Sequence, residues 1–283
     1  MAAAAAISRA TPPLLRTALV TGGNRGIGFE VCRRLALQGW KVYLGGRNSA
    51  AVNVAVENIN RKLALDMLAV SGLILDVSDS KGIATSLHSL EATSFNLVIN
   101  NAGVLEDGWT SKIWKETMTT NLSGPLDVIS GVRKMMVDSS LILNVSSGYG
   151  SLAECPSKAY RDMVQTRVSV SELRQLVTDD GFMPDDPGAA MYVPAYRVSK
   201  CALNRATQLL SVDEGLVGRS IAVAACCPGW VRTRMGGSSA TRSVEEGAAS
   251  VLATVNDHFK AVEEGVPSPV AGGFFRDGKA LKW

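Results

Sequence analysis

The chain has 283 residues, of which 46% are apolar and 19% charged, and its formal net charge is +3. This composition is that of a globular protein large enough to bury a substantial core. The absence of a basic run and the low aromatic content give little support for nucleic-acid binding. No stretch of about 18 uncharged apolar residues occurs, which argues against a membrane span.

Cysteine and histidine usage argues against a disulfide framework and against a metal site. The five cysteines are scattered and form no CxxC pair, which is typical of core residues in a reducing compartment such as the cytoplasm. His88 and His258 have no neighbouring Cys or His ligand pattern, so neither a zinc site nor a histidine-based hydrolase triad is expected. We interpret both histidines as surface or helix-cap residues.

The N-terminus is rich in alanine, contains Arg9 and Arg16, and has no acidic residue before Glu30. This composition hints at an organellar presequence. Because the first predicted strand begins near Leu15, such a presequence would be short, and we favour a disordered tail over residues 1–14.

Along the chain, short runs of β-forming residues alternate with longer helical stretches. The first run, LLRTALVTGG, enters a glycine turn and is followed by a predicted helix from about Gly26 to Leu37. Further strands are expected at about 41–46, 72–79, 95–103, 140–147, 219–229 and 272–275, and further helices at about 49–67, 80–90, 111–136, 195–214 and 243–263. This alternation predicts a parallel sheet covered by helices. Since no repeat or linker divides it, we predict one doubly wound α/β domain over residues 15–283.

Residues 148–195 do not fit the alternation. They carry clustered acidic residues and prolines, and Ser169 and Glu172 match a capping box. We interpret this segment as an insertion that bears its own helix.

The turn after the first strand reads TGGNRGIG, residues 21–28. Its glycines permit close approach of the backbone, and the helix that follows offers free N–H groups and the positive end of its dipole. A pyrophosphate would fit there. The spacing differs from GxGxxG, so the turn alone leaves open a purely structural strand-to-helix connection.

The end of the second strand reads GGRN. In dinucleotide-binding folds this position normally carries an acid that binds the ribose 2′-OH of NAD. Here Arg47 takes its place, and Arg25 lies in the glycine turn. Two guanidiniums suit a 2′-phosphate, so NADPH is the expected cofactor. The alternative is that both arginines are surface charges.

Tyr196 and Lys200, in the segment PAYRVSK, are four residues apart. On a helix they share a face, which places an ammonium beside a phenol. A fall of about 2–3 in the phenol pKa, equivalent to about 3–4 kcal/mol, would make Tyr196 a proton donor and acceptor near neutral pH. On this segment alone, the alternative is a partly buried tyrosine and a solvated lysine on an ordinary helix.

Five motifs occur in order: TGGNRGIG, NNAG at 100–103, NVSS at 144–147, YRVSK at 196–200 and PGWVRT at 228–233. Through them the chain resembles the short-chain dehydrogenase/reductase family over about residues 15–283. The resemblance implies a single Rossmann-fold domain that transfers a hydride between NADP(H) and a small carbonyl compound or its alcohol.

The resemblance also implies a catalytic set. Tyr196 would protonate the carbonyl oxygen, and Lys200 would lower the tyrosine pKa and bind the nicotinamide ribose. Ser147 would orient the substrate carbonyl, with Ser146 as the less favoured candidate. Asn121, in TTNLSG, would hold a water of the proton relay.

Cofactor-binding residues follow from the same resemblance. Asn100 to Gly103 would line the adenosine side, and Asp76 would contact the adenine. Val231 and Thr233 would hold the carboxamide. The expected set is Gly22, Asn24, Arg25, Gly26, Ile27, Gly28, Arg47, Asp76, Asn100, Ala102, Gly103, Tyr196, Lys200, Pro228, Gly229, Val231 and Thr233.

The serine and tyrosine motifs are separated by residues 148–195, a longer separation than in most members of the family. In this respect the chain resembles the monomeric carbonyl-reductase branch, which includes menthone and salutaridine reductases. In that branch the inserted helix covers the surface used elsewhere for assembly. The resemblance therefore implies a monomer whose insertion forms one wall of the substrate pocket; the alternative is a surface loop.

Apolar residues close in sequence to these motifs are candidates for the pocket lining. Met191, Tyr192 and Trp230 are the favoured ones. Trp109 and Trp114 are at least as readily explained by helix packing, and Tyr149 and Cys155 are better explained as packing residues than as substrate contacts. The glycine- and serine-rich loop at 234–246 is interpreted as a lid.

Three functional hypotheses remain open from the sequence. The leading one is an NADPH-dependent carbonyl reductase of ketones or aldehydes. The second is a specialised biosynthetic ketoreductase or NADP-dependent alcohol dehydrogenase. The third is a non-catalytic NADPH sensor, which is disfavoured because Ser147, Tyr196, Lys200 and Asn121 are all present.

Overall fold

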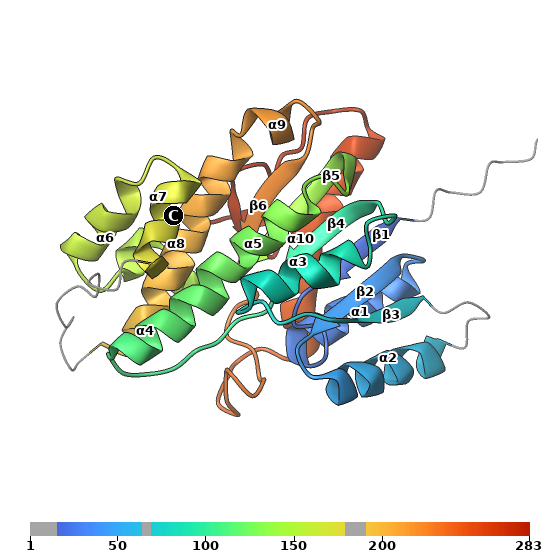
Figure 1. Cartoon of the computed structure of the whole chain (residues 1–283), viewed down its shortest axis with the longest axis horizontal. Helices are drawn as coiled ribbons and strands as arrows, with labels where there is room; N and C mark the ends of the chain where they lie inside the picture. Colours follow the sequence, from blue (N-terminus) through green and yellow to red (C-terminus); the bar gives the residue numbers. More distant parts are fainter. Residues whose placement is uncertain (1–15, 64–68, 179–190) are drawn as a thin grey trace, which may run out of the picture.

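The computed structural model describes residues 16–63, 69–178 and 191–283. The predicted tail, the end of the second predicted helix and part of the predicted insertion lie outside these ranges. Within them, the strands form one eight-stranded sheet in the order β3-β2-β1-β4-β5-β6-β7-β8 (Figure 1). Every pair of neighbouring strands is parallel except β7 and β8.

The strands are β1 (Thr17–Val20), β2 (Lys41–Gly46), β3 (Val70–Ile74), β4 (Phe95–Asn100), β5 (Met136–Val145), β6 (Ala222–Cys226), β7 (Phe274–Arg276) and β8 (Lys279–Ala280). The helices are α1 (Gly26–Leu37), α2 (Ser49–Leu63), α3 (Ser80–His88), α4 (Ser111–Met118), α5 (Gly124–Val132), α6 (Lys158–Gln165), α7 (Val170–Thr178), α8 (Pro194–Ser211), α9 (Glu214–Val217) and α10 (Val244–Glu263).

Both faces of the sheet are covered by helices, which is why central strands such as β1 and β6 are buried and apolar along nearly their whole length. In β1, Leu19 belongs to the core under α3, α4, α5 and α8, whereas Ala18 and Val20 belong to the core under α1, α2 and α10. This arrangement confirms the predicted doubly wound α/β fold. Among the described residues, none of the helices combines the length and apolar character needed to cross a bilayer.

The chain reverses its direction of travel across the sheet between β3 and β4, so β1 and β4 are neighbours at the switch point. In open parallel sheets ligands bind beyond the carboxyl ends of the strands at such a point. The fold therefore places the predicted motifs, which follow β1, β2, β4, β5 and β6, along one edge of the sheet.

The helix predicted over 111–136 is wrong in its length and continuity. A π-helical turn (Thr119–Ser123) separates α4 from α5, and β5 already begins at Met136. The side chain of Asn121 inside this turn is completely buried and bonded to other segments. Those tertiary bonds hold the extra residue in the turn, and a local hydrophobic pattern carries no information about them.

The described part of the insertion contains two helices, α6 and α7, where one was predicted. Both pack against α8, on its side away from β3 (Figure 1). Ser169 accepts the predicted bond from the Glu172 N–H at 3.2 Å, but the Glu172 carboxylate reaches the N–H of Val168 at 3.0 Å. The capping box is therefore only half formed, because the carboxylate binds one residue beyond the cap.

The interpretation of His258 as a surface residue is wrong, since its side chain is completely buried in α10. Its two ring nitrogens lie 2.8 Å from Ser268 Oγ and 3.3 Å from the carbonyl oxygen of Ser139. Two polar partners allow an imidazole to be buried without an unpaired nitrogen. His88, in contrast, is exposed at the end of α3.

Candidate active site

The glycine turn is held against the segment that follows β4. The Asn101 side-chain amide donates to the carbonyl oxygens of Thr21 and Gly22 at 2.9 and 3.1 Å. The Thr21 hydroxyl accepts from the N–H groups of Asn101 and Ala102, both at 3.0 Å. Neither Thr21 nor the side chain of Asn101 was assigned a positioning role from the sequence, because each acts through contacts between distant segments.

Two glycines of this turn are required by close approach of other atoms. Gly22 has a φ of +63°, and a Cβ there would lie 2.9 Å from Ala102 Cα. A Cβ on Gly28 would lie 2.4 Å from both Asn101 Nδ2 and the carbonyl oxygen of Gly22. A side chain at either position would push the turn away from the segment after β4, so glycine is required to keep the two segments in contact.

Three exposed arginines gather beside this turn: Arg25, Arg47 and Arg234. Burial lowers the pKa of Arg25 below its ordinary value, and the like charges of Arg234 and Arg47 lower it further. Among the described residues, none of the three guanidiniums has an acidic partner or a hydrogen bond. Such a donor set fits the predicted phosphate-bearing cofactor. Arg234 was not predicted to belong to it.

Tyr196 and Lys200 both lie on the buried face of α8, and their side chains are only 7% and 4% exposed. Lys200 Nζ donates to the carbonyl oxygen of Val145, at the end of β5, at 2.9 Å. The same Nζ lies 5.6 Å from the centre of the Tyr196 ring. The helix therefore places an ammonium beside a phenol, and both groups are largely shielded from water.

The predicted fall in the pKa of Tyr196 is wrong. Burial raises the pKa of the phenol to about 12, while a hydrogen bond with Ser147 acts in the opposite direction. Burial lowers the pKa of Lys200 to about 8. The loss of water around both groups outweighs their mutual attraction, because the ammonium is turned toward the Val145 carbonyl.

Ser147 and Ser146 point in different directions after β5. The Ser147 hydroxyl lies close enough to the Tyr196 phenol to lower its pKa, and it accepts from the N–H of Tyr149 at 3.2 Å. The Ser146 hydroxyl is buried and donates to the backbone carbonyl of Lys200 at 3.4 Å. Of the two serines, Ser147 is the one beside the phenol.

Asn121 links the segment after β4 to α8. Its Oδ1 accepts from the N–H of Val104, and its Nδ2 donates to the carbonyl of Val104, both at 2.9 Å. Nδ2 also lies 3.0 Å from Ser199 Oγ, which donates to the Tyr196 carbonyl at 2.8 Å. Gly103 lies against both catalytic candidates, since a Cβ there would be 3.2 Å from Asn121 Oδ1 and 3.6 Å from Lys200 Nζ.

Other predicted cofactor-binding side chains are engaged by the protein itself. Asn100 is buried and donates to Asn144 Oδ1 at 2.9 Å, between β4 and β5. Asp76 accepts from the N–H and hydroxyl of Ser78 at 2.9 and 2.7 Å, beyond the end of β3. Thr233 lies against the glycine turn, with Cγ2 at 3.4 Å from a Cβ placed on Gly26.

The aromatic residues proposed for the pocket divide into two groups. Tyr192 and Trp230 are about half exposed near the site, at 53% and 54%. Trp109 packs edge-on against Trp114 at 5.3 Å between ring centres, and the Trp114 indole donates to the Leu176 carbonyl of α7 at 3.2 Å. Tyr149, in the insertion, lies edge-on to Tyr196 with 6.5 Å between ring centres.

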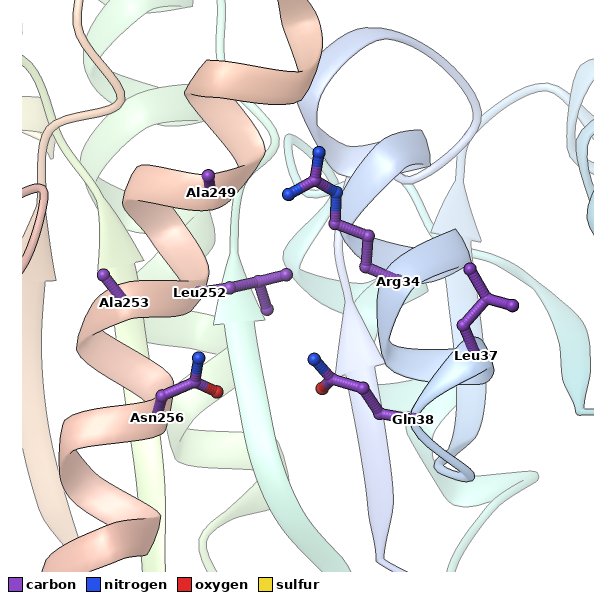
Figure 2. A pocket seen from close by; sticks show the side chains of 7 residues that line it. All are labelled: Arg34, Leu37, Gln38, Ala249, Leu252, Ala253 and Asn256. Carbon is purple, nitrogen blue, oxygen red and sulfur yellow. The ribbon is translucent and has the colours of Figure 1, made fainter.

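A cavity of about 350 Å³ opens elsewhere, between α1 and α10 (Figure 2). Its lining residues are Arg34, Leu37, Gln38, Ala249, Leu252, Ala253 and Asn256. None of them belongs to a predicted motif, and those on α1 lie toward the helix end remote from the glycine turn. The candidate active site is therefore defined by the converging motifs and not by this cavity.

Comparison with known proteins agrees with the geometry. The family model for short chain dehydrogenase matches residues 16–161. A (+)-neomenthol dehydrogenase of Arabidopsis thaliana is 32% identical over 270 residues, covering 83% of this chain and 89% of the relative. Carbonyl reductase (NADPH) 1 of Oryctolagus cuniculus is 32% identical over 249 residues, covering 82% and 88% respectively. The crystal structure of NADPH-bound carbonyl reductase from chicken fatty liver has a TM-score of 0.67 at 26% identity, covering 95% of this chain and 99% of that one. The chain belongs to the short-chain dehydrogenase family.

Proposed function

We propose that this protein is an NADPH-dependent carbonyl reductase that converts ketones or aldehydes to alcohols. The observation that carries the proposal is the pair of buried side chains Tyr196 and Lys200, with the partly buried Ser147 beside them, at the edge of the sheet where the glycine turn lies. NADPH supplies the hydride when it is bound. The relatives named above for carbonyl reduction and for neomenthol oxidation support the same chemistry in its two directions.

The protein's part is to supply a proton where charge develops. A carbonyl carbon that receives a hydride leaves negative charge on its oxygen. Since the pKa of Tyr196 is about 12, its phenol is protonated at neutral pH and can donate to that oxygen. Ser147 lies beside the same phenol, and its hydroxyl would offer a second hydrogen bond to the substrate oxygen.

Lys200 and Asn121 complete the proposed relay. With a pKa of about 8, Lys200 is mostly charged at neutral pH, and its ammonium stabilises the phenolate left after proton donation. Both side-chain ends of Asn121 are engaged by Val104 and Ser199. The water of the relay would therefore contact the backbone carbonyl of Asn121, and the Asn121 side chain would hold the π-helical turn in position.

NADPH is proposed over NADH because the residue directly after β2 is an arginine and not an acid. Arg47 occupies the position after that strand, and Arg25 lies beside it in the glycine turn. The 2′-phosphate would be bound by these two guanidiniums. The names of the carbonyl reductase relatives also include NADPH.

We also propose that the protein acts as a monomer. Buried residues of α6 and α7, including Tyr160 and Leu173, belong to the same core as α8. The helix that carries Tyr196 is thus covered by its own chain on that side.

The test is NADPH consumption with a panel of ketones, aldehydes, quinones and cyclic terpenoid ketones. Tyr196→Phe should lower turnover by about 10²–10⁴-fold, because the proton donor is lost, while NADPH binding is retained. Tyr43→Phe is the matched control, since its hydroxyl lies 3.4 Å from Thr93, away from the predicted motifs. Undiminished turnover by Tyr196→Phe, or no turnover of any panel compound by a wild type that binds NADPH, would contradict the proposal.

The panel also separates two kinds of reductase. Activity on many chemically unrelated carbonyl compounds would identify a generalist. Activity confined to one class, such as cyclic terpenoid ketones, would identify a specialised biosynthetic ketoreductase. The proposed proton relay is the same for both kinds of reductase.

A further inference from the structure

Arg234 stands out among the arginines that follow β6. Arg242 pairs with Asp277 at 2.7 Å, and Arg232 donates to the carbonyl of Ala240 at 3.1 Å. Within residues 16–63, 69–178 and 191–283, Arg234 has neither an acidic partner nor a hydrogen bond, and it is exposed. The two neighbouring arginines thus stabilise the loop, whereas the Arg234 guanidinium is available to a ligand.

The loop itself is held in place against the glycine turn. Val231 and Arg242 form an isolated bridge, and the N–H of Arg232 bonds the carbonyl of Arg242 at 2.8 Å. Thr233 accepts from the N–H of Gly236 at 3.1 Å, and its methyl group lies against Gly26. Arg234 therefore directly follows a residue, Thr233, that contacts the glycine turn in which Arg25 lies.

Arg234 faces two other cations there. Arg25 comes from the turn after β1, Arg47 from the end of β2, and Arg234 from the loop after β6. The positive charges of Arg234 and Arg47 both lower the pKa of Arg25, and Thr233, next to Arg234 in the chain, lies against Gly26, next to Arg25, so Arg25 has a second cation on each side of the turn. Three like charges without an acid between them repel one another, and an anion placed among them would relieve the repulsion.

We propose that Arg234 is a third binding residue for the 2′-phosphate of NADPH, together with Arg25 and Arg47. The inference rests on the proposed function, since it needs NADPH to be the cofactor. It adds a specificity residue that comes from the opposite side of the turn and that belongs to the loop at 232–241. Binding of the phosphate then also fixes this loop over the cofactor.

The experiment measures dissociation constants, without turnover, by fluorescence or calorimetric titration with NADPH, NADH and adenosine 2′,5′-bisphosphate. Arg234→Gln is compared with the wild type, with Arg47→Gln as the reference change and Arg61→Gln as the control. Arg61 is exposed on α2 and pairs with Glu57 at 3.7 Å, so its replacement removes the same charge at a position remote from the glycine turn.

We expect Arg234→Gln to weaken binding of NADPH and of adenosine 2′,5′-bisphosphate by about tenfold, with NADH little affected. The loss should shrink as salt is raised, because the contact is between exposed charges. Arg234→Lys should recover part of the affinity. Arg232→Gln removes the bond to the Ala240 carbonyl and leaves Arg234 unchanged, so its effect on NADPH affinity shows what a change in the loop's own structure contributes.

Two results would overturn the inference. Unchanged NADPH affinity in Arg234→Gln would remove Arg234 from the site, and equal losses for NADPH and NADH would exclude the 2′-phosphate as its ligand. Both results leave the proposed function intact. A wild type that binds neither NADPH nor adenosine 2′,5′-bisphosphate would instead defeat the proposed function itself.

Discussion

Lys200 is a cation that the fold keeps almost entirely out of water, with its ammonium against the Val145 carbonyl. Burial lowers its pKa from 10.5 to about 8. At a pH below 8 the lysine is charged in both the folded and the unfolded state, so the full cost of removing the charge from water is present. Between pH 8 and 10.5 the folded state loses the proton first, and this cost disappears as the pH rises.

Lys200→Met should therefore stabilise the protein while abolishing its activity. At pH 7 the free energy of unfolding should rise by up to about 3 kcal/mol, less the cost of leaving the Val145 carbonyl unpaired. The gain should shrink as the pH approaches 10.5. Urea denaturation of both proteins at several pH values measures this difference, and comparing the two proteins cancels the other titrating groups.

Lys260→Met is the matched control for this change, because Lys260 is exposed on α10 and lies 3.9 Å from Glu264. It should leave the free energy of unfolding nearly unchanged at every pH. A Lys200→Met protein that is less stable than the wild type at pH 7, or a difference that does not depend on pH, would show that burial of the ammonium carries no such cost.

At the scale of single residues, the sequence could identify Tyr196, Lys200 and Ser147, but it could not predict how their pKa values shift. The i, i+4 spacing predicts that the phenol and the ammonium are neighbours. It contains no information about the depth of burial, which decides the direction of the Tyr196 shift. The position of Arg234 near Arg25 could not be predicted, because the two residues lie far apart in the sequence.

Among the elements, the loop at 232–241 is the segment where we expect NADPH to have its clearest effect. Its regular structure is limited to the isolated bridge at Val231 and a few turns, and Arg232 and Arg234 are exposed in it. We expect trypsin to cleave after these arginines in the free protein and more slowly when NADPH is present. At about 100 times the dissociation constant, binding can suppress a coupled opening by about 100-fold.

Cleavage elsewhere serves as the internal control for this experiment. Arg61 and Lys62 are exposed near the end of α2, away from the glycine turn. Their cleavage rate should not respond to NADPH. If the loop and α2 are protected equally, NADPH acts on the whole protein, and if neither is protected, the interpretation of the loop as a lid is wrong.

Element boundaries were predictable where local chemistry determines them and not where distant contacts do. The helix from Gly26 to Leu37 was predicted with the bounds that α1 has, because a glycine turn precedes it and Gly39 follows it. The π-helical turn at Asn121 interrupts a hydrophobic pattern that reads as one helix. Its bonds to Val104 and Ser199 form only in the folded chain.

At the scale of the whole molecule, the alternation of strands and helices was sufficient to predict the doubly wound sheet. Parallel strands joined by right-handed crossovers leave few possible strand orders, so β3-β2-β1-β4-β5-β6-β7 follows with little further information. The position of α6 and α7 could not be derived in this way. Their place on α8 depends on side chains such as Leu173 and Leu176, which are buried against the same core.

That placement leads to a prediction about assembly. Because α6 and α7 pack on α8, this side of the helix is not available to a second copy of the chain. We expect sedimentation velocity to give one species with the mass of a single chain, unchanged over a wide range of protein concentrations. Addition of NADPH should leave that mass unchanged, since the cofactor residues lie at the edge of the sheet and not on α6 or α7.

The variant Leu173→Asp sharpens the test, because Leu173 is completely buried between α7 and the core. A charge there should detach α7 and expose the apolar side of α8, which favours association of the variant. A wild type that already sediments at twice or four times the chain mass, and keeps that mass on dilution, would contradict the monomer. It would mean that another face of the molecule, and not α8, pairs the chains.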